Sequence, residues 1–132
     1  MNTLVNFDIA KLLKDKGCDI QSAFVYKTEN NKTFVLIPSG LNPMDGLFST
    51  YSAPKIAKVV MWLYEKHGVW ISIAPRFNND GSLWFVYESL ILSTNNMTTL
   101  NDNLFKGHFN EMFETPTEAY SAAVLYTLNN LI

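Results

Sequence analysis

The chain has little of the residue types on which metal sites and disulfide frameworks depend. Its 132 residues include one cysteine, Cys18, and two histidines, His67 and His108. A single cysteine excludes an internal disulfide framework. The two histidines and the cysteine also lack the paired spacing that zinc ligands show in sequence. We therefore expect neither a metal nor another cofactor.

The motifs of nucleotide binding and of nucleophilic catalysis are missing as well. The chain contains neither G-x-x-x-x-G-K-S/T nor G-x-G-x-x-G, the glycine-rich loops that hold phosphates. It has no G-x-S-x-G turn to present a nucleophile. Of the acidic residues, Asp80 already has a role in a turn and Glu114 precedes a helix. We predict a protein that is not an enzyme and has no catalytic residue.

Neither a charge surplus nor a long apolar run is present. The formal net charge is −2, so no basic excess exists to release counterions from a polyanion, and nucleic acid is not an expected partner. Every apolar stretch is much shorter than the roughly 20 residues of a membrane span. The opening sequence MNTLVNFDIAKLL has no basic segment followed by an apolar one, as a signal peptide would. We expect a soluble intracellular protein that does not bind a membrane.

The stretch from Tyr51 to Ala74 has the clearest pattern in the chain. Ser52 as N-cap, Pro54 in the first turn and Gly68 as terminator predict a helix over residues 53–67. Apolar residues at i, i+3, i+4 and i+7 form the stripe expected on its buried side: Ile56, Val59, Val60 and Leu63. After the glycine the apolar period changes to two, which predicts a strand.

The first third of the chain predicts a helix, a hairpin and a loop. Asn6 can cap a short helix that Gly17 ends. Residues 22–28 and 33–37 are rich in aromatic and β-branched types and flank an Asn-containing turn, which predicts a hairpin. Residues 38–50 contain two prolines and two glycines without any periodicity. We interpret this segment as a loop and as the first place to look for a binding surface.

The second half predicts a hairpin and a further strand. The turn residues Asn78–Gly81 join strands over 69–76 and 83–92. The second of these strands is apolar on both faces, so we expect it to be central in the sheet or covered on both sides. Residues 108–113 have the pattern of a last strand.

The final element is a helix over residues 116–130. Thr115 and Glu118 form a capping box, with Pro116 at the first helical position. The predicted order is therefore αββαβββα. It corresponds to a single α+β domain over residues 1–132, with three helices and a mostly antiparallel sheet of about five strands.

Aromatic residues are abundant, at 14% of the chain. Trp62 and Trp70 lie off the main apolar stripes, so they either form a second core layer or are exposed at an interface. The candidate binding surface consists of five residues: Trp62, Trp70, Trp84, Met44 and Phe48. If Trp62 and Trp70 are not both buried within one chain, a two-fold homodimer could cover them.

Three segments resemble a family of small uncharacterised proteins encoded by phages and prophages of gut anaerobic bacteria. They are the opening FDIAKLLKDKGCD, the central YSAP followed by VVMWLYEKHGVWISI, and a closing F-x-T-x-x-E-A between Phe113 and Ala119. The resemblance spans most of the chain and brings no catalytic residue or cofactor with it. It implies a phage accessory protein in the cytoplasm of a bacterial host cell.

Two functions are compatible with these observations. The first is a phage-type accessory protein that is not an enzyme and binds a host or phage protein. The alternative is a binding protein that sequesters a small molecule or nucleotide. A concave apolar site near Trp70, Trp84 and residues 38–50 would favour the small ligand, whereas a flat exposed aromatic patch would favour a protein partner.

Overall fold

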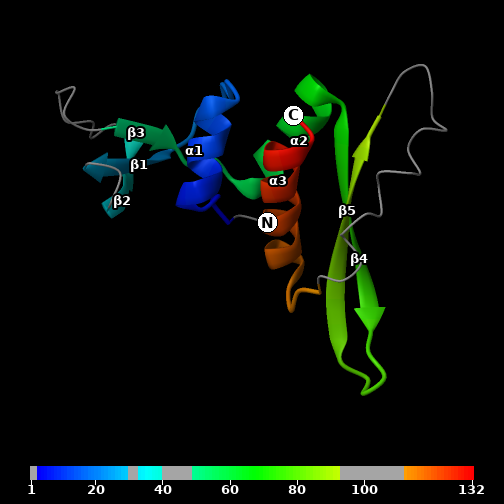
Figure 1. Ribbon diagram of the computed structural model, residues 1–132. Coiled ribbons are helices and arrows are strands. Elements are labelled where there is room, and N and C mark those ends of the chain that lie inside the picture. Colours follow the sequence, from blue (N-terminus) through cyan, green and yellow to red (C-terminus); the bar gives the residue numbers. More distant parts are fainter. Residues whose placement is uncertain (1–2, 30–32, 40–48, 93–111) are drawn as a thin grey trace. The chain divides into compact units, whose positions relative to one another are not determined.

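The computed structural model describes residues 3–29, 33–39, 49–92 and 112–132 (Figure 1). Its elements follow in this order: α1 (Phe7–Asp15), β1 (Phe24–Glu29), β2 (Thr33–Pro38), β3 (Ser49–Ser52), α2 (Ile56–His67), β4 (Val69–Phe77), β5 (Leu83–Ile91) and α3 (Pro116–Asn130). The α+β class, the three helices and the antiparallel pairing of five strands are confirmed. The chain divides into two compact units, residues 1–59 and 60–132, so its description as a single domain stays a prediction.

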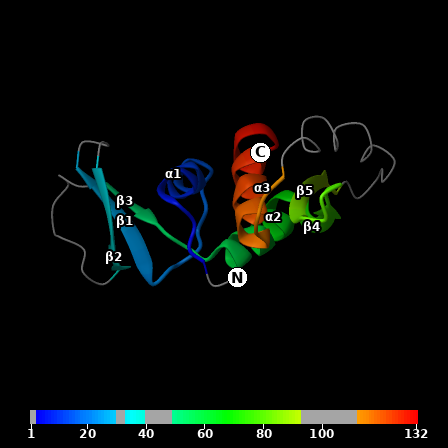
Figure 2. The same ribbon diagram turned by 90° about the horizontal axis from the view of Figure 1, so that it is seen from below.

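In the first unit, α1 packs on a three-stranded sheet of order β2-β1-β3 (Figures 1 and 2). The Asn6 side chain caps α1 by accepting a hydrogen bond of 2.9 Å from the Ile9 amide, as predicted. The Phe7 ring lies against two sheet residues, 5.6 Å from the Tyr26 ring and 4.5 Å from the Phe34 ring. Aromatic contacts thus join α1 to the sheet, and aliphatic side chains such as Val5, Ile9 and Leu13 complete the buried core of this unit.

Strand β3 corrects the prediction for Ser52. The sequence analysis makes this residue the N-cap of α2, but it is the last residue of β3, and α2 begins at Ile56. The Ser52 hydroxyl donates to the Ile20 carbonyl at 3.1 Å and lies 2.7 Å from the Ser22 hydroxyl. The cap prediction is wrong because pairing with β1 holds Ser52 in a strand and its hydroxyl is engaged by Ile20 and Ser22, which are distant in sequence.

In the second unit, α3 packs on the two-stranded sheet of β4 and β5 (Figure 1). The Thr127 hydroxyl lies in the buried contact, 3.1 Å from the Ser89 hydroxyl, and also donates to the Ala123 carbonyl at 2.8 Å. The rings of Tyr87 and Tyr126 meet beside it at 6.3 Å. The helix thus covers the face of the hairpin that carries the odd-numbered side chains.

The strands form two sheets, where the sequence analysis expects one. Each sheet is built around a hairpin whose residues are close in sequence, and strand periodicity does not specify which hairpins join. The last predicted strand, 108–113, lies mostly outside the described residues. At its end Phe113 forms an antiparallel bridge with Phe85, through two amide-to-carbonyl hydrogen bonds of 2.8 and 2.9 Å. That bridge gives β5 a neighbour on the side away from β4.

The predicted apolar stripe of α2 is confirmed. Its four members are buried: Ile56, Val59, Val60 and Leu63. The helix ends at Gly68, which has a φ of 65° and donates from its amide to the Tyr64 carbonyl at 3.1 Å. The chain then passes directly into β4.

The N-cap of α3 provides a test of the second unit. The Thr115 hydroxyl accepts a hydrogen bond of 3.1 Å from the Glu118 amide. We expect Thr115→Ala to lower the free energy of unfolding by about 1 kcal/mol, because that amide loses its partner. Chemical denaturation measures the change, with Thr117→Ala inside the same first turn as a control that leaves the cap intact. A denaturation midpoint that Thr115→Ala does not move would contradict the cap.

Candidate functional site

The turn between β4 and β5 is held by hydrogen bonds within five residues. The Asn78 amide donates to the Ser82 carbonyl, and the Gly81 amide donates to the Asn78 carbonyl, both at 2.9 Å. Gly81 has a φ of 85°, a conformation that glycine adopts without strain. The Asp80 carboxylate then accepts from both the amide and the hydroxyl of Ser82, at 2.9 and 2.6 Å. The turn predicted at Asn78–Gly81 is confirmed.

Trp84, in strand β5, stabilises this turn through a hydrogen bond to Ser82. The Ser82 hydroxyl donates to Asp80 and accepts from the Trp84 indole nitrogen at 2.8 Å and from the Asn78 side-chain amide at 3.3 Å. The hydrogen bonds from the hydroxyl and then the amide of Ser82 hold the pKa of the Asp80 carboxyl below its ordinary value. The carboxylate therefore remains an acceptor near neutral pH, and the turn is pre-organised.

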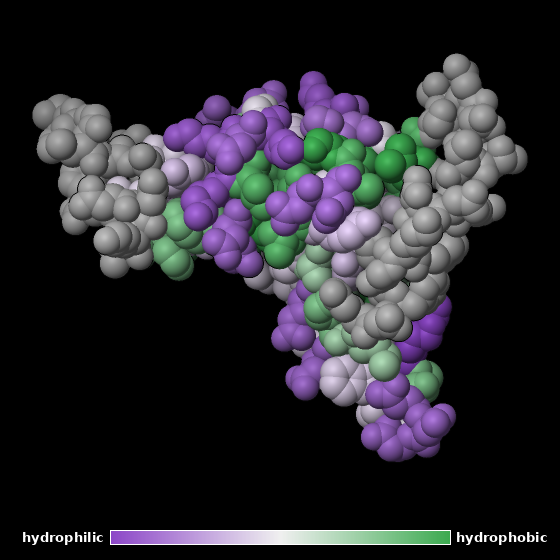
Figure 3. Space-filling view, in the orientation of Figure 1, coloured by the Kyte–Doolittle hydropathy of each residue, from purple (hydrophilic) through white to green (hydrophobic). Residues whose placement is uncertain are grey.

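Two apolar side chains flank the turn and face each other across the hairpin. Phe77 and Leu83 are directly paired, and they are 74% and 46% exposed. We call these two residues, with the turn 78–82, the hairpin tip. Figure 3 shows hydrophilic residues at the end of the hairpin and apolar residues beside them. Isolated exposed apolar residues are common, whereas a paired set beside a braced turn is suited to binding.

The three tryptophans of the predicted surface have different environments. Trp62 is only 7% exposed, and its ring meets the His67 ring at 4.7 Å. Its assignment to a binding surface is therefore wrong, as is a dimer contact centred on it. Trp62 lies on the flank of the apolar stripe of α2, and this flank belongs to the core. Trp70 is 41% exposed, and its ring meets the Tyr64 ring edge-on at 5.4 Å.

Trp70 and Trp84 share a face of the hairpin but do not form one patch. Trp70 pairs with Leu90 at the start of β4, whereas Trp84 pairs with Arg76 near the turn. At roughly 3.4 Å per residue these positions are about 20 Å apart along the strand. The other two members of the predicted surface, Met44 and Phe48, lie outside the described residues.

Phe77 and Leu83 are the residues that the sequence analysis missed. Both occupy apolar positions of strands, and periodicity assigns each to a face without showing how far a covering helix extends along it. In Figure 1, β4 and β5 continue well beyond the first turn of α3. The far end of the face that α3 covers therefore remains exposed.

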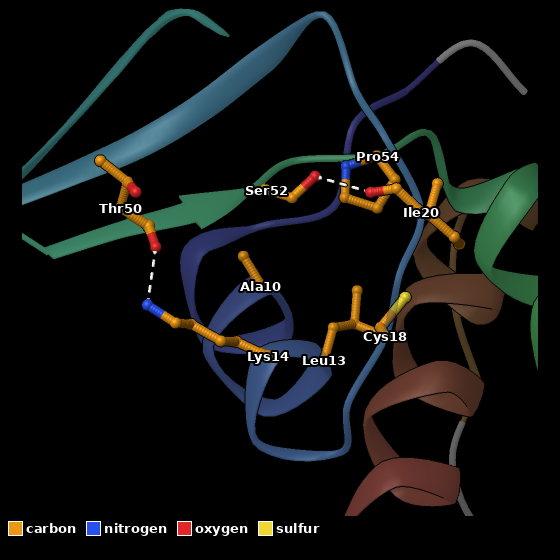
Figure 4. Close-up of a pocket in the computed structure, with 8 residues that line it drawn as sticks. All are labelled: Ala10, Leu13, Lys14, Cys18, Ile20, Thr50, Ser52 and Pro54. Carbon is orange, nitrogen blue, oxygen red and sulfur yellow. Dashed lines mark hydrogen bonds between the residues drawn. The ribbon is translucent and has the colours of Figure 1, made fainter. Parts of the chain in front are cut away.

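A cavity of about 270 Å³ lies in the first unit, beside α1 (Figure 4). It is lined by Ala10, Leu13, Lys14, Cys18, Ile20, Thr50, Ser52 and Pro54. The Lys14 ammonium group donates to the Thr50 carbonyl at 3.1 Å and lies 4.7 Å from the centre of the Tyr51 ring. The Ser52 hydroxyl is also engaged by the fold. The polar groups that line the cavity are therefore largely engaged in hydrogen bonds within the protein. The volume of the cavity is also below the usual range for ligand sites.

Cys18 gives this cavity little chemical reactivity. Burial raises the pKa of its thiol, and the negative charge of Asp19 adds to that effect, although a backbone hydrogen bond at Ile20 opposes it. A thiol with a raised pKa stays protonated near neutral pH, whereas the thiolate is the nucleophile and metal ligand. Within the described ranges, no group of three or more His, Cys, Asp or Glu residues is arranged to hold a metal ion.

Two further results bear on location and relatives. In the described part of the structure, none of the helices has the length and apolar character needed to cross a membrane. Comparison with known protein families, with curated proteins and with solved structures finds no match. The resemblance to phage proteins therefore stays a prediction.

Proposed function

We propose that the protein is a phage-type accessory protein that binds a host or phage protein without catalysis, and that the hairpin tip is its binding surface. The observation that carries this proposal is the exposure of Phe77 opposite Leu83 beside a braced turn. Aromatic side chains are enriched among the residues that dominate interface energies. A turn held by its own hydrogen bonds loses little further freedom when it binds, which favours affinity.

The charge of the second unit supports a protein partner over a nucleic acid or an anionic lipid surface. Residues 60–132 contain seven acidic and three basic residues, a net charge of −4. A phosphate-rich partner would be repelled by this excess. The tip itself carries the Asp80 carboxylate next to its apolar pair. A fitting partner would offer an apolar pocket for Phe77 and a basic or hydrogen-bond-donating rim for Asp80.

The alternative function, sequestration of a small molecule or nucleotide, is favoured by the cavity beside α1. Its lining combines apolar side chains with the Lys14 ammonium group and two hydroxyl-bearing residues. A ligand there would have to be small and would compete with the Thr50 carbonyl for Lys14. Native mass spectrometry of the purified protein distinguishes this function, because it would show a retained compound in the absence of any protein partner.

Two double variants test the proposal, each replacing two exposed apolar residues of the second unit. Phe77→Ser with Leu83→Ser removes the apolar pair of the tip. Ile91→Ser with Met112→Ser replaces two other exposed apolar residues of the same unit. Each purified protein is immobilised and exposed to lysates of bacterial host cells with and without induced phage. Any retained protein is then purified, and its dissociation constant is measured by calorimetry.

We expect a partner whose affinity falls at least tenfold with the tip variant and is unchanged with the control variant. This corresponds to a loss of about 1.4 kcal/mol or more, which is typical of an interface anchor. A partner that binds the tip variant as well as the wild type would contradict the assignment to the tip. The absence of any retained protein would contradict the binding function itself.

A further inference from the structure

Strand β2 presents an apolar edge of the sheet in the first unit. The order β2-β1-β3 places it at one border, and among the described residues it pairs with β1 alone. Three consecutive side chains of this strand are exposed, with Val35 the most open at 60%: Phe34, Val35 and Leu36. Residues 33–38 include no charged side chain, so the strand lacks the lysines that often protect such edges.

The opposite border of the same sheet is partly covered. There the Lys14 side chain of α1 donates to the Thr50 carbonyl of β3 at 3.1 Å. The Ala53 amide donates to the Phe24 carbonyl at 2.9 Å, and hydrogen-bonded pairs alternate along the ladder. Tyr51 is therefore bonded to β1, and the backbone groups of Thr50 point away from it. In the described part of this sheet, β2 is therefore the more open of the two edges.

The pairing register shows which backbone groups of β2 point outward. The Ser39 amide donates to the Ala23 carbonyl at 2.9 Å, so this pair is hydrogen-bonded. Hydrogen-bonded and non-hydrogen-bonded pairs alternate along an antiparallel ladder. Val35 therefore bonds to Lys27 of β1, and the amides and carbonyls of Phe34 and Leu36 face the open edge.

We propose that a second copy of this chain pairs with β2 as an antiparallel strand, about a two-fold axis at Val35. In this register Phe34 is opposite Leu36 of the second copy, and Leu36 is opposite its Phe34. Each of these two pairs exchanges two hydrogen bonds, so the amides and carbonyls of Phe34 and Leu36 in each copy all find a partner. The edge is thus complementary to itself.

Two neighbouring registers satisfy fewer of these groups. A shift by one residue would set outward groups against groups already bonded to β1. A pairing centred on Leu36 would place Phe34 opposite Pro38, which has no amide hydrogen to donate. Centring on Val35 avoids both losses, which is why the proposal specifies that register.

The side chains also suit a second copy. Phe34 and Leu36 lie on the face that carries α1, where the Phe34 ring stacks on Phe7, so the two copies would extend this apolar layer. Val35 lies on the other face, opposite Val35 of the second copy, in the type of pair where side chains approach closest. One added strand buries little area, so the association is weak and appears at high protein concentration.

Sedimentation velocity over a concentration series tests the proposal with charge changes at Val35. We expect the wild type to form dimers as its concentration rises. Val35→Lys and Val35→Glu each place like charges face to face at the axis, and each shifts half-dimerisation to at least tenfold higher concentration. An equimolar mixture of the two variants restores the dimer, because Lys then meets Glu. Circular dichroism confirms that both variants, changed at an exposed position, keep the fold.

Each remaining outcome overturns the proposal. A wild type that stays monomeric at every attainable concentration would show that a second copy does not pair with β2. Variants that dimerise like the wild type place the contact elsewhere, and a mixture that does not recover removes the two-fold register at Val35. Ile91→Lys, a charge placed on an exposed strand residue of the second unit, is the matched control and leaves the dimer unchanged.

Discussion

Leu63→Ala should lower the free energy of unfolding by about 2 to 5 kcal/mol. Leu63 is among the largest side chains that are completely buried, and it belongs to the continuous apolar stripe of α2. Truncation to alanine removes the transfer free energy of its methyl and methylene groups and leaves a cavity that the close-packed surroundings fill only in part. Urea denaturation, monitored by tryptophan fluorescence, measures the change.

Met61→Ala is the matched control for this prediction. Met61 is a side chain of similar size on the same helix, and it is exposed. Because alanine is at least as good a helix former, we expect a change of less than about 1 kcal/mol. Equal losses from Leu63→Ala and Met61→Ala would show that α2 does not bury the face assigned to it.

Gly68→Ala should cost about 1 to 3 kcal/mol. Gly68 has a φ of 65°, which L-residues with a Cβ adopt only with strain. A Cβ at this position would lie 3.2 Å from the Leu92 carbonyl oxygen, a backbone atom that cannot rotate away. The Gly68 carbonyl also accepts from the Leu92 amide at 2.7 Å, which ties the end of α2 to the end of β5.

Gly17→Ala separates the two contributions to that cost. Gly17 also ends a helix with a positive φ, of 74°, but a Cβ there would meet no atom within 4 Å. It therefore reports the conformational strain alone, and we expect a smaller loss than for Gly68→Ala. Denaturation midpoints that fall equally in both variants would contradict a steric role for the Leu92 carbonyl.

Helix positions could be predicted because the signals that set them are local. Asn6 and Thr115 cap α1 and α3 through hydrogen bonds to amides three residues ahead, a spacing that the sequence shows directly. Gly17 and Gly68 mark helix ends by the same local chemistry. The prediction failed at Ser52, whose hydroxyl is engaged by Ser22 and Ile20, about thirty residues earlier in the chain.

Sheet organisation was less predictable, because strand pairing depends on contacts distant in sequence. Both hairpins were found from their turn residues and alternation. Strand β3 was missed, since its four residues are too few for a periodic pattern and its pairing partner lies more than twenty residues away. Alternation also predicts on which face of a strand a side chain lies, but not how much of that face a helix covers. The exposure of Phe77 could therefore not be predicted.

The candidate site illustrates the same limit. Aromatic content correctly drew attention to the β4–β5 hairpin, but it could not distinguish Trp62, which is buried, from Trp70, which is exposed. Trp84 belongs to the site in a different role from the one predicted, since it braces the turn through Ser82. The backbone conformation of the turn residues places Phe77 and Leu83 opposite each other as a fixed pair.

Site-specific photocrosslinking tests binding through the hairpin tip most directly. A benzophenone amino acid is introduced at position 77 in one variant and at position 91 in another, and each full-length protein is irradiated in host cells. The account predicts a crosslink from position 77 to one host or phage protein and none to that protein from position 91. A crosslink from position 91 alone, or none from position 77, would contradict it.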